Sequence, residues 1–193
     1  MAHSGNWTER MNECIALLRG VNVGRTKRIA MADLRALIEA LGHTNVRTVL
    51  NSGNVVFQAA RPHTARIATA IETALEGRFG WRATTMVVTA DELGAIIREN
   101  PLAQIADDAS RHLVAFVASP ATLTKAKLLL AQSWTPDALA VGKRAAYLWC
   151  ADGLIESRLA QAFARSAGDA ATTRNWATVL KLHAMASGDR DAR

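Results

Sequence analysis

The sequence predicts an α+β protein built from two consecutive units, each with the order strand, helix, hairpin, helix. Three observations support this prediction. An apolar run followed by a helical pattern occurs near residue 14 and again near residue 112. In each unit, two β-rich runs then flank a cluster of turn-forming residues, which indicates a hairpin. No linker rich in Gly, Ser or Pro separates the units, so we expect them to pack closely.

Strong boundary signals support the elements of the first unit. Gly42 ends a helical pattern, as glycine often does. Thr89 and Glu92 form a capping box, and that helix must end before Pro101 because the residue before proline resists the helical conformation. The predicted elements are a strand at 14–18, a helix at 31–41, hairpin strands at 46–50 and 55–57, a helix at 67–79, a strand at 84–89 and a helix from 90 to about 99.

The second unit repeats this order up to its end. Ser119 and Pro120 are typical of a helix start, with proline at the first helical position. The predicted elements are a strand at 112–118, a helix from 120 to about 132, hairpin strands at 139–141 and 145–150, a helix at 156–167 and a last helix that begins near 172 or 173. This last helix takes the place of a fourth strand in the prediction.

The order of elements is compatible with two tandem ferredoxin-like (βαββα-type) subdomains packed together. We place the N-terminal subdomain at residues 11–105 and the C-terminal subdomain at residues 106–186. The polar ends at 1–10 and 187–193 are predicted to be flexible tails.

Composition narrows the class of protein. Half of the 193 residues are hydrophobic and 21% are charged, which is typical of a globular protein. No apolar run approaches the roughly 18 residues of a membrane helix, so no membrane partner is expected. The two cysteines, Cys14 and Cys150, lie in apolar runs and are predicted to be buried and reduced, which indicates the cytoplasm.

A basic loop follows the first strand and is the first candidate binding segment. It contains Arg19, Asn22 and Arg25 between and beside Gly20 and Gly24. A phosphate-binding P-loop needs four residues between its glycines and then Lys-Ser/Thr, so this spacing excludes it. Two interpretations stand: a turn with solvated cations, or an anion site of another kind that uses backbone amides and arginine.

The hairpin turn at Ser52, Gly53 and Asn54 is the second candidate. Asn and Gly tolerate the backbone conformations of tight turns, which explains the segment without a ligand. Ser52 lacks the flanking glycines of a nucleophile elbow. As a functional alternative, Ser52 and Asn54 would form hydrogen bonds to a ligand.

Arg174 and Asn175 belong to the third candidate, at the predicted start of the last helix. A cation in the first turn opposes the helix dipole unless an anion lies near, which suggests a binding site. The alternative is that Arg174 pairs with a carboxylate elsewhere and Trp176 packs in the core.

Metal and cofactor chemistry is not indicated by any motif. The five histidines are scattered without the spacing of metal ligands, and the cysteines add none. We therefore predict no metal and no cofactor, and we assign no catalytic residue.

Several of these segments together resemble the bacterial family called domain of unknown function 1697. The resemblance rests on the runs 16–24, 31–34, 46–48, 52–57 and 173–182, and it covers roughly residues 11–186. It implies two ferredoxin-like subdomains side by side and no established activity. The family often has two glycines before the basic stretch, and Arg25 occupies the place of the second.

The functional hypothesis is a small ligand with a phosphate or carboxylate group, bound in a cleft between the two halves. Arg19 and Arg174 would hold the anion, with Asn22, Asn54 and Asn175 among the groups that orient it. One alternative is an interaction module without a ligand. The other is a nucleic-acid binding protein, which the net charge of +6 supports but the 5% aromatic content does not.

Overall fold

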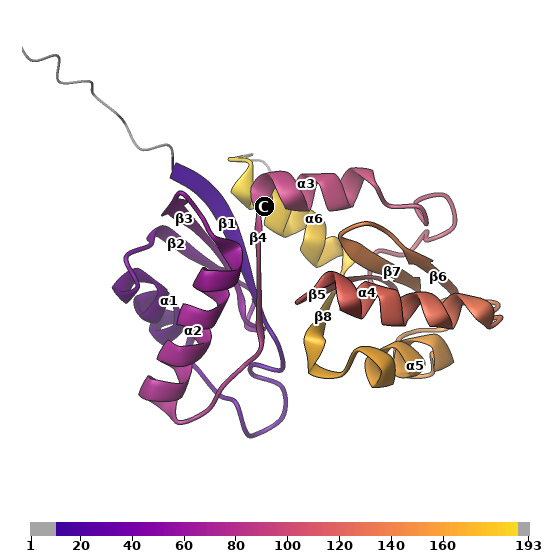
Figure 1. Cartoon of the computed structure of the whole chain (residues 1–193), viewed down its shortest axis with the longest axis horizontal. Coiled ribbons are helices and arrows are strands. Elements are labelled where there is room, and N and C mark those ends of the chain that lie inside the picture. The colour runs from indigo at the N-terminus through magenta and orange to yellow at the C-terminus, as the bar shows by residue number, and fades with distance from the viewer. Residues whose placement is uncertain (1–10, 189–193) are drawn as a thin grey trace, which may run out of the picture.

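The computed structural model describes residues 11–188, which form two four-stranded antiparallel sheets and six α-helices (Figure 1). The predicted tail at 1–10 and most of the tail at 187–193 lie outside the described residues. None of the described helices is long and apolar enough to span a membrane.

The first half has the order β-α-β-β-α-β-α. Its elements are β1 (Met11–Leu18), α1 (Met31–Ala40), β2 (Thr44–Val49), β3 (Asn54–Ala60), α2 (Thr64–Phe79), β4 (Thr85–Thr89) and α3 (Ala90–Arg98). The strand order in its sheet is β2-β3-β1-β4. The predicted capping box is present, since Thr89 accepts from the N–H of Glu92 and the Glu92 carboxylate accepts from the N–H of Thr89.

The second half repeats the same order completely. Its elements are β5 (His112–Val117), α4 (Pro120–Lys127), a 3-10 turn (Leu128–Ala131), β6 (Ala138–Val141), β7 (Ala145–Trp149), α5 (Arg158–Ala167), a 3-10 turn (Gly168–Ala170), β8 (Ala171–Asn175) and α6 (Trp176–Ala186). The strand order β6-β7-β5-β8 matches that of the first half.

The prediction of a helix from residue 172 or 173 is wrong. Residues 171–175 form β8, which pairs with β5 so that Arg174 lies opposite Val114. The helix begins at Trp176, and its N-cap is Asn175, whose side chain accepts from the N–H of Thr178. Arg174 is therefore a strand residue, and the predicted conflict with a helix dipole does not arise.

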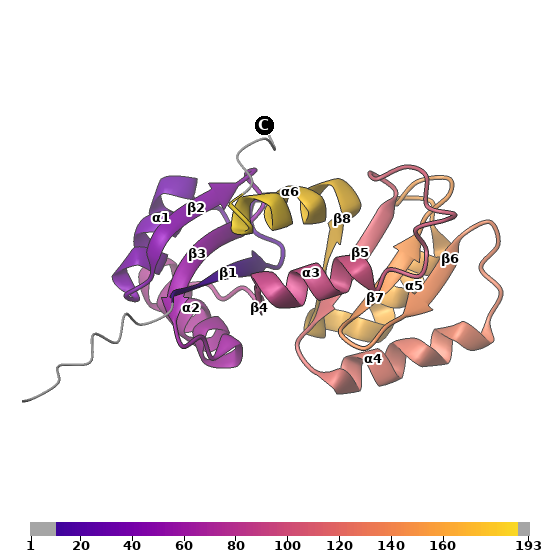
Figure 2. The same cartoon turned by 90° about the horizontal axis from the view of Figure 1, so that it is seen from above.

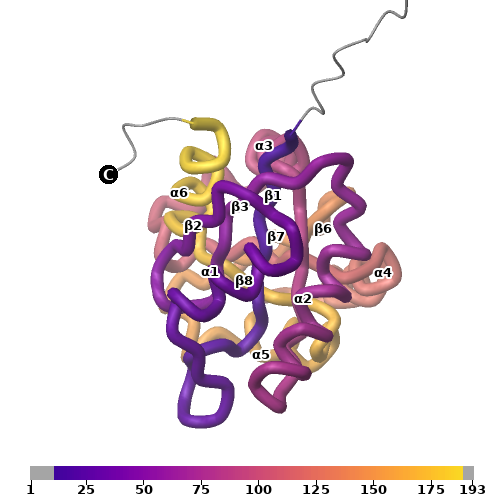
Figure 3. The backbone as a smooth tube through the Cα atoms, turned by 90° about the vertical axis from the view of Figure 1, so that its left-hand side faces the viewer, coloured from indigo at the N-terminus to yellow at the C-terminus, as the bar shows by residue number. Residues whose placement is uncertain are grey.

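Three apolar layers hold the fold together. One face of the first sheet packs on α1 and α2, and one face of the second sheet packs on α4 and α5. The remaining two faces share a central core with α3 and α6, which lie between the sheets (Figure 2). Figure 3 views the molecule from the side of α1 and α2.

Strand β1 shows why this arrangement follows from the sequence. Cys14, Ala16 and Leu18 face α1 and α2, whereas Ile15 and Leu17 face the central core. All five are at most 1% exposed. A strand covered on both faces needs a continuous apolar run rather than alternation, which is what this segment contains.

The last helix interlocks the halves. Helix α6 packs against α3 and also against β1 and β3 of the first sheet. Arg47 of β2 donates from Nη1 to the carbonyl of Met185 near the end of α6 at 3.1 Å. The hydroxyl of Tyr147 on β7 donates to the carbonyl of Ile96 on α3 at 2.7 Å.

Candidate functional site

Arg174 lies at the seam between the two halves and uses all five of its N–H groups within the protein. Nε donates to Oδ1 of Asn54, and Nη1 donates to Oγ1 of Thr172 and to the carbonyl of Thr173, both at 2.8 Å. Nη2 donates to the carbonyl of Leu18 at 2.9 Å and to that of Ser52 at 3.4 Å. The guanidinium therefore joins β8 to the first half and has no N–H left for a ligand.

Every acceptor around Arg174 is a neutral oxygen. Among residues 11–188, no carboxylate forms an ion pair with it. Burial lowers the pKa of Arg174 to about 10, so the side chain remains a cation at neutral pH. The charge is solvated by the protein itself, through hydrogen bonds to oxygen dipoles.

Arg19 approaches the same seam from the first half. Its Nε donates to Oδ1 of Asp169 at 3.1 Å, and Nη1 donates to the carbonyl of Ala171 at 2.7 Å. Two of its five N–H groups are thus engaged, and the other three have no partner in the described part of the chain. Arg19 thus bonds to the backbone of β8, and Arg174 bonds to the carbonyl of Leu18 in β1, but only Arg19 keeps free donors among the described residues.

Asn22 shapes the basic loop and forms no hydrogen bond with the residues that bond to Arg174. Its φ of 58° lies in the left-handed region. Its side chain accepts from the N–H of Ile29 and donates to the Ile29 carbonyl and to Asn51. Arg25 is exposed and forms no ion pair within the described residues. Within the described residues, neither Asn22 nor Arg25 therefore takes part in the Arg174 network.

The hairpin segment does reach the Arg174 network. Asn54 is fully buried, and its amide nitrogen donates to the carbonyl of Val49 and to Oγ of Ser52. Ser52 also contributes its carbonyl to Arg174. Asn175 caps α6 instead. Of the predicted residues, Arg174, Asn54 and Ser52 form one network, which fastens the halves together.

A groove of about 470 Å³ lies between the halves, beside this network. The first half contributes the outer edge of β4, one face of α2 and part of α3, and the second half contributes the end of β5, the start of α4 and the β6–β7 hairpin. Its apolar lining includes Met86, Ile96, Phe116 and Leu123, each at most 5% exposed. The backbone N–H of Arg19 donates to the carbonyl of Thr84, which is also a lining residue of the groove.

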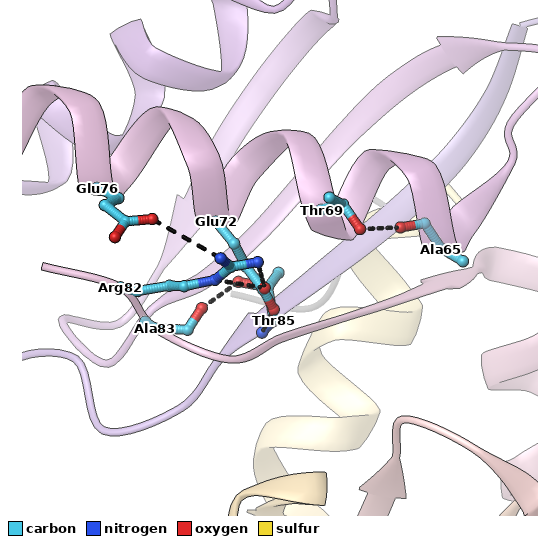
Figure 4. A network of polar contacts seen from close by, with 7 residues as sticks. All are labelled: Ala65, Thr69, Glu72, Glu76, Arg82, Ala83 and Thr85. Atoms are coloured by element: carbon cyan, nitrogen blue, oxygen red, sulfur yellow. Dashed lines mark hydrogen bonds and ion pairs between the residues drawn. The ribbon is translucent and has the colours of Figure 1, made fainter.

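The first-half wall of the groove carries a carboxylate whose charge is already balanced. Glu72 accepts from Nε and Nη2 of Arg82 at 3.1 and 2.9 Å and from the N–H of Thr85 at 2.8 Å (Figure 4). Glu76 lies 3.7 Å from Nη1 of the same arginine. Glu72 thus caps the free edge of β4, and Arg82 balances its charge. Glu92, the other carboxylate of this wall, accepts from the N–H of Thr89 and forms no ion pair within residues 11–188, so the wall is negative overall.

The second-half wall carries the positive groups. Lys143 is exposed and forms no ion pair within residues 11–188, whereas Arg144 pairs with Glu99 at 3.3 Å. Ser119 is the N-cap of α4, yet its side chain makes no capping hydrogen bond. The sequence did not indicate the Lys143 and Arg144 turn as a binding segment. This Gly-Lys-Arg turn is distant in sequence from the other groove residues, and its pattern is that of an ordinary solvated turn.

The cysteines and the possible metal ligands of the described chain give little support for nucleophilic or metal chemistry. Cys14 and Cys150 are free and buried, and burial raises the pKa of Cys14 to about 11. In the described part of the chain, no group of three or more His, Cys, Asp or Glu side chains could hold a metal ion.

Comparison with known families agrees with the resemblance seen in the sequence. Residues 11–147 match the family described as "Protein of unknown function (DUF1697)". The chain belongs to this family. The match stops before the 173–182 segment, which contributed to the resemblance.

A solved structure shares the fold of this DUF1697 protein. It is that of the conserved bacterial protein SP0830 from Streptococcus pneumoniae, which is 21% identical, with a TM-score of 0.71. The alignment covers 92% of this chain and 99% of that one. No curated protein matches the chain.

Proposed function

We propose that the protein binds a small ligand with an anionic group and an apolar body in the groove between its halves. The carrying observation is the groove itself, whose volume of about 470 Å³ falls within the range of ~300–1,000 Å³ typical of small-molecule sites. It combines a buried apolar floor with a few polar groups, which is the usual composition of such sites.

The anionic group belongs on the second-half wall in this proposal. Lys143 is the one groove cation among the described residues without a carboxylate partner, and the lining also contains Ser119, whose hydroxyl makes no capping hydrogen bond. The apolar body would lie on Met86, Phe116 and Leu123.

A backbone N–H group completes the proposed set of ligand-binding groups. The N–H groups of Thr85 and Thr89 point to the outer edge of β4, since carboxylates of Glu72 and Glu92 accept from them. Alternation along an antiparallel strand places the N–H of Val87 on the same edge, where it can donate to a ligand.

Arg174 has a positioning role in this proposal. By joining β8 to Leu18 and Asn54, it holds the two halves in the relative placement that creates the groove. We also assign each half, at residues 11–105 and 106–186, to the ferredoxin-like class, which the β-α-β-β-α-β order and the antiparallel strand order support.

An interaction module without a ligand is the second candidate, favoured by the complete internal use of the Arg174 donors. Nucleic-acid binding through a sheet face, as in RNA-recognition domains, has less support, because helices and the central core cover both faces of both sheets.

Thermal unfolding with inorganic phosphate, phenyl phosphate and AMP tests the proposal. A ligand at 100 times its Kd stabilises the folded state by ~2.7 kcal/mol, which raises Tm by roughly 5–10 °C for a chain of this size. We expect the two probes with an aromatic body to raise Tm more than inorganic phosphate does.

Two groove variants and one matched control make the test specific. Lys143→Ala should weaken binding by about tenfold, and Ala68→Phe should block the groove from α2. Lys125→Ala removes an exposed lysine of α4 outside the lining and should change nothing. Equal Tm shifts in all three variants, or no shift with any probe, would rule the proposal out.

A further inference from the structure

A second, smaller hollow lies below β8, on the side of the strand that faces α5. Its volume is about 110 Å³, and it shares no lining residue with the groove. The walls are apolar, and the deepest ones are formed by Leu113, Leu148, Phe163 and Ala171, each at most 4% exposed. We call this hollow the β8 pit.

Alternation along β8 separates the pit from the seam. Thr172 and Arg174 bond to each other on the side of the strand that faces the first half. Ala171 and Thr173 line the pit on the opposite side. The pit is therefore independent of the network that fastens the two halves.

The lining of the pit contains one cationic side chain, that of Arg19. Arg19 comes from the first half, and three of its five N–H groups have no partner in the described part of the chain. Its only carboxylate partner there is Asp169, whose side chain is 89% exposed, against 37% for Arg19. Such an exposed pair is weak, so an incoming carboxylate can compete with it.

We propose that the β8 pit binds a short-chain aliphatic monocarboxylate, with the carboxylate on Arg19 and the hydrocarbon tail inside the pit. Guanidinium N–H groups match a carboxylate in geometry and charge. The apolar walls offer no partner to a polar tail. Thr173 also lines the pit, but it is exposed and belongs to its rim rather than to its buried walls.

The volume of the pit limits the length of the ligand's hydrocarbon tail. A protein cavity of ~150 Å³ accommodates benzene, which has six carbon atoms. By proportion, a pit of about 110 Å³ takes about four carbon atoms, the tail of pentanoate. Longer chains would leave their remaining carbons in water.

Titration of the whole protein with acetate, butanoate, pentanoate and octanoate, followed by amide NMR shifts, tests this inference. Each buried methylene should tighten Kd about fourfold, so pentanoate should bind roughly 60-fold tighter than acetate. Octanoate should gain little beyond pentanoate. The shifting amides should be those of α5, β8 and the residues beside Arg19.

Variants separate the charge from the cavity. Arg19→Gln should weaken pentanoate binding at least about tenfold, whereas Asp169→Asn, by freeing Arg19, should tighten it up to about fivefold. Arg25→Gln, in the same loop but outside the pit, is the matched control and should have no effect.

Ala164→Leu places bulk at an exposed lining position of α5 and should weaken pentanoate more than acetate. Ala177→Leu, at an exposed α6 position, is its control. Affinity that keeps rising through octanoate would show adsorption to a surface and overturn the inference. So would pentanoate binding that Arg19→Gln and Asp169→Asn leave unchanged.

Discussion

Replacing Arg174 by methionine tests whether this side chain fastens the two halves. Methionine preserves much of the length but removes all five donors, and three buried acceptors lose their partner: Oδ1 of Asn54, Oγ1 of Thr172 and the carbonyl of Leu18. Each unsatisfied buried acceptor costs ~1–3 kcal/mol, and removal of a desolvated cation offsets part of the sum. We expect the free energy of unfolding to fall by about 3 kcal/mol.

Urea unfolding followed by circular dichroism measures this loss, with Arg25→Met as the control. Arg25 is exposed and unpaired among the described residues, so its replacement should change stability by less than ~0.5 kcal/mol. A double-mutant cycle of Arg174→Met with Asn54→Ala should give a coupling energy of at least ~1 kcal/mol. A loss below ~1 kcal/mol for Arg174→Met, or additive effects in the cycle, would refute the reasoning.

Two further predictions concern backbone strain and pH. Gly53→Ala should destabilise by about 2–4 kcal/mol in urea unfolding, because φ is +70° and the new Cβ would lie 2.9 Å from Cβ of Leu18; Gly24→Ala, with φ of +67° and open space around it, should cost only ~1 kcal/mol. Burial lowers the pKa of His112 and of His43 below 6.5, so the unfolded chain binds protons first and stability is lost as pH falls below about 6.5. His112→Phe should make the urea midpoint less sensitive to pH between 7 and 5, and an unchanged slope would contradict this assignment.

The order of elements could be predicted from the sequence almost to its end. Apolar runs such as 14–18 and capping residues such as Thr89 are local signals, and the structure contains the elements they predict. Strand β8 was missed because its evidence is not local. Residues 171–175 include two threonines that look like helix caps, and the strand exists through pairing with β5, more than fifty residues earlier.

The same missing strand explains why Arg174 was wrongly placed in the first turn of a helix. As a residue of the first helical turn, Arg174 would oppose the helix dipole, which suggested a bound anion. As a residue of β8, it points at the first half, and neutral oxygens accept the hydrogen bonds of its guanidinium. The sequence identified Arg174, Asn54 and Ser52 as candidate ligand-binding residues, and the structure joins them in one hydrogen-bond network. The sequence could not tell a ligand site from a fastening network, because that depends on how many donors the folded chain already satisfies.

The arrangement of the sheets leaves a hollow beside the last strand of each half. Helices α3 and α6 each follow the last strand of their half directly, and both enter the central core, which removes the open sheet faces from solvent. The groove lies along the outer edge of β4, and the pit lies beside the face of β8 that carries Ala171 and Thr173. Strands β4 and β8 hold equivalent places in the two halves. The repeat therefore offers two different hollows beside equivalent strands, and their unlike cations, Lys143 and Arg19, predict that each takes a different acid.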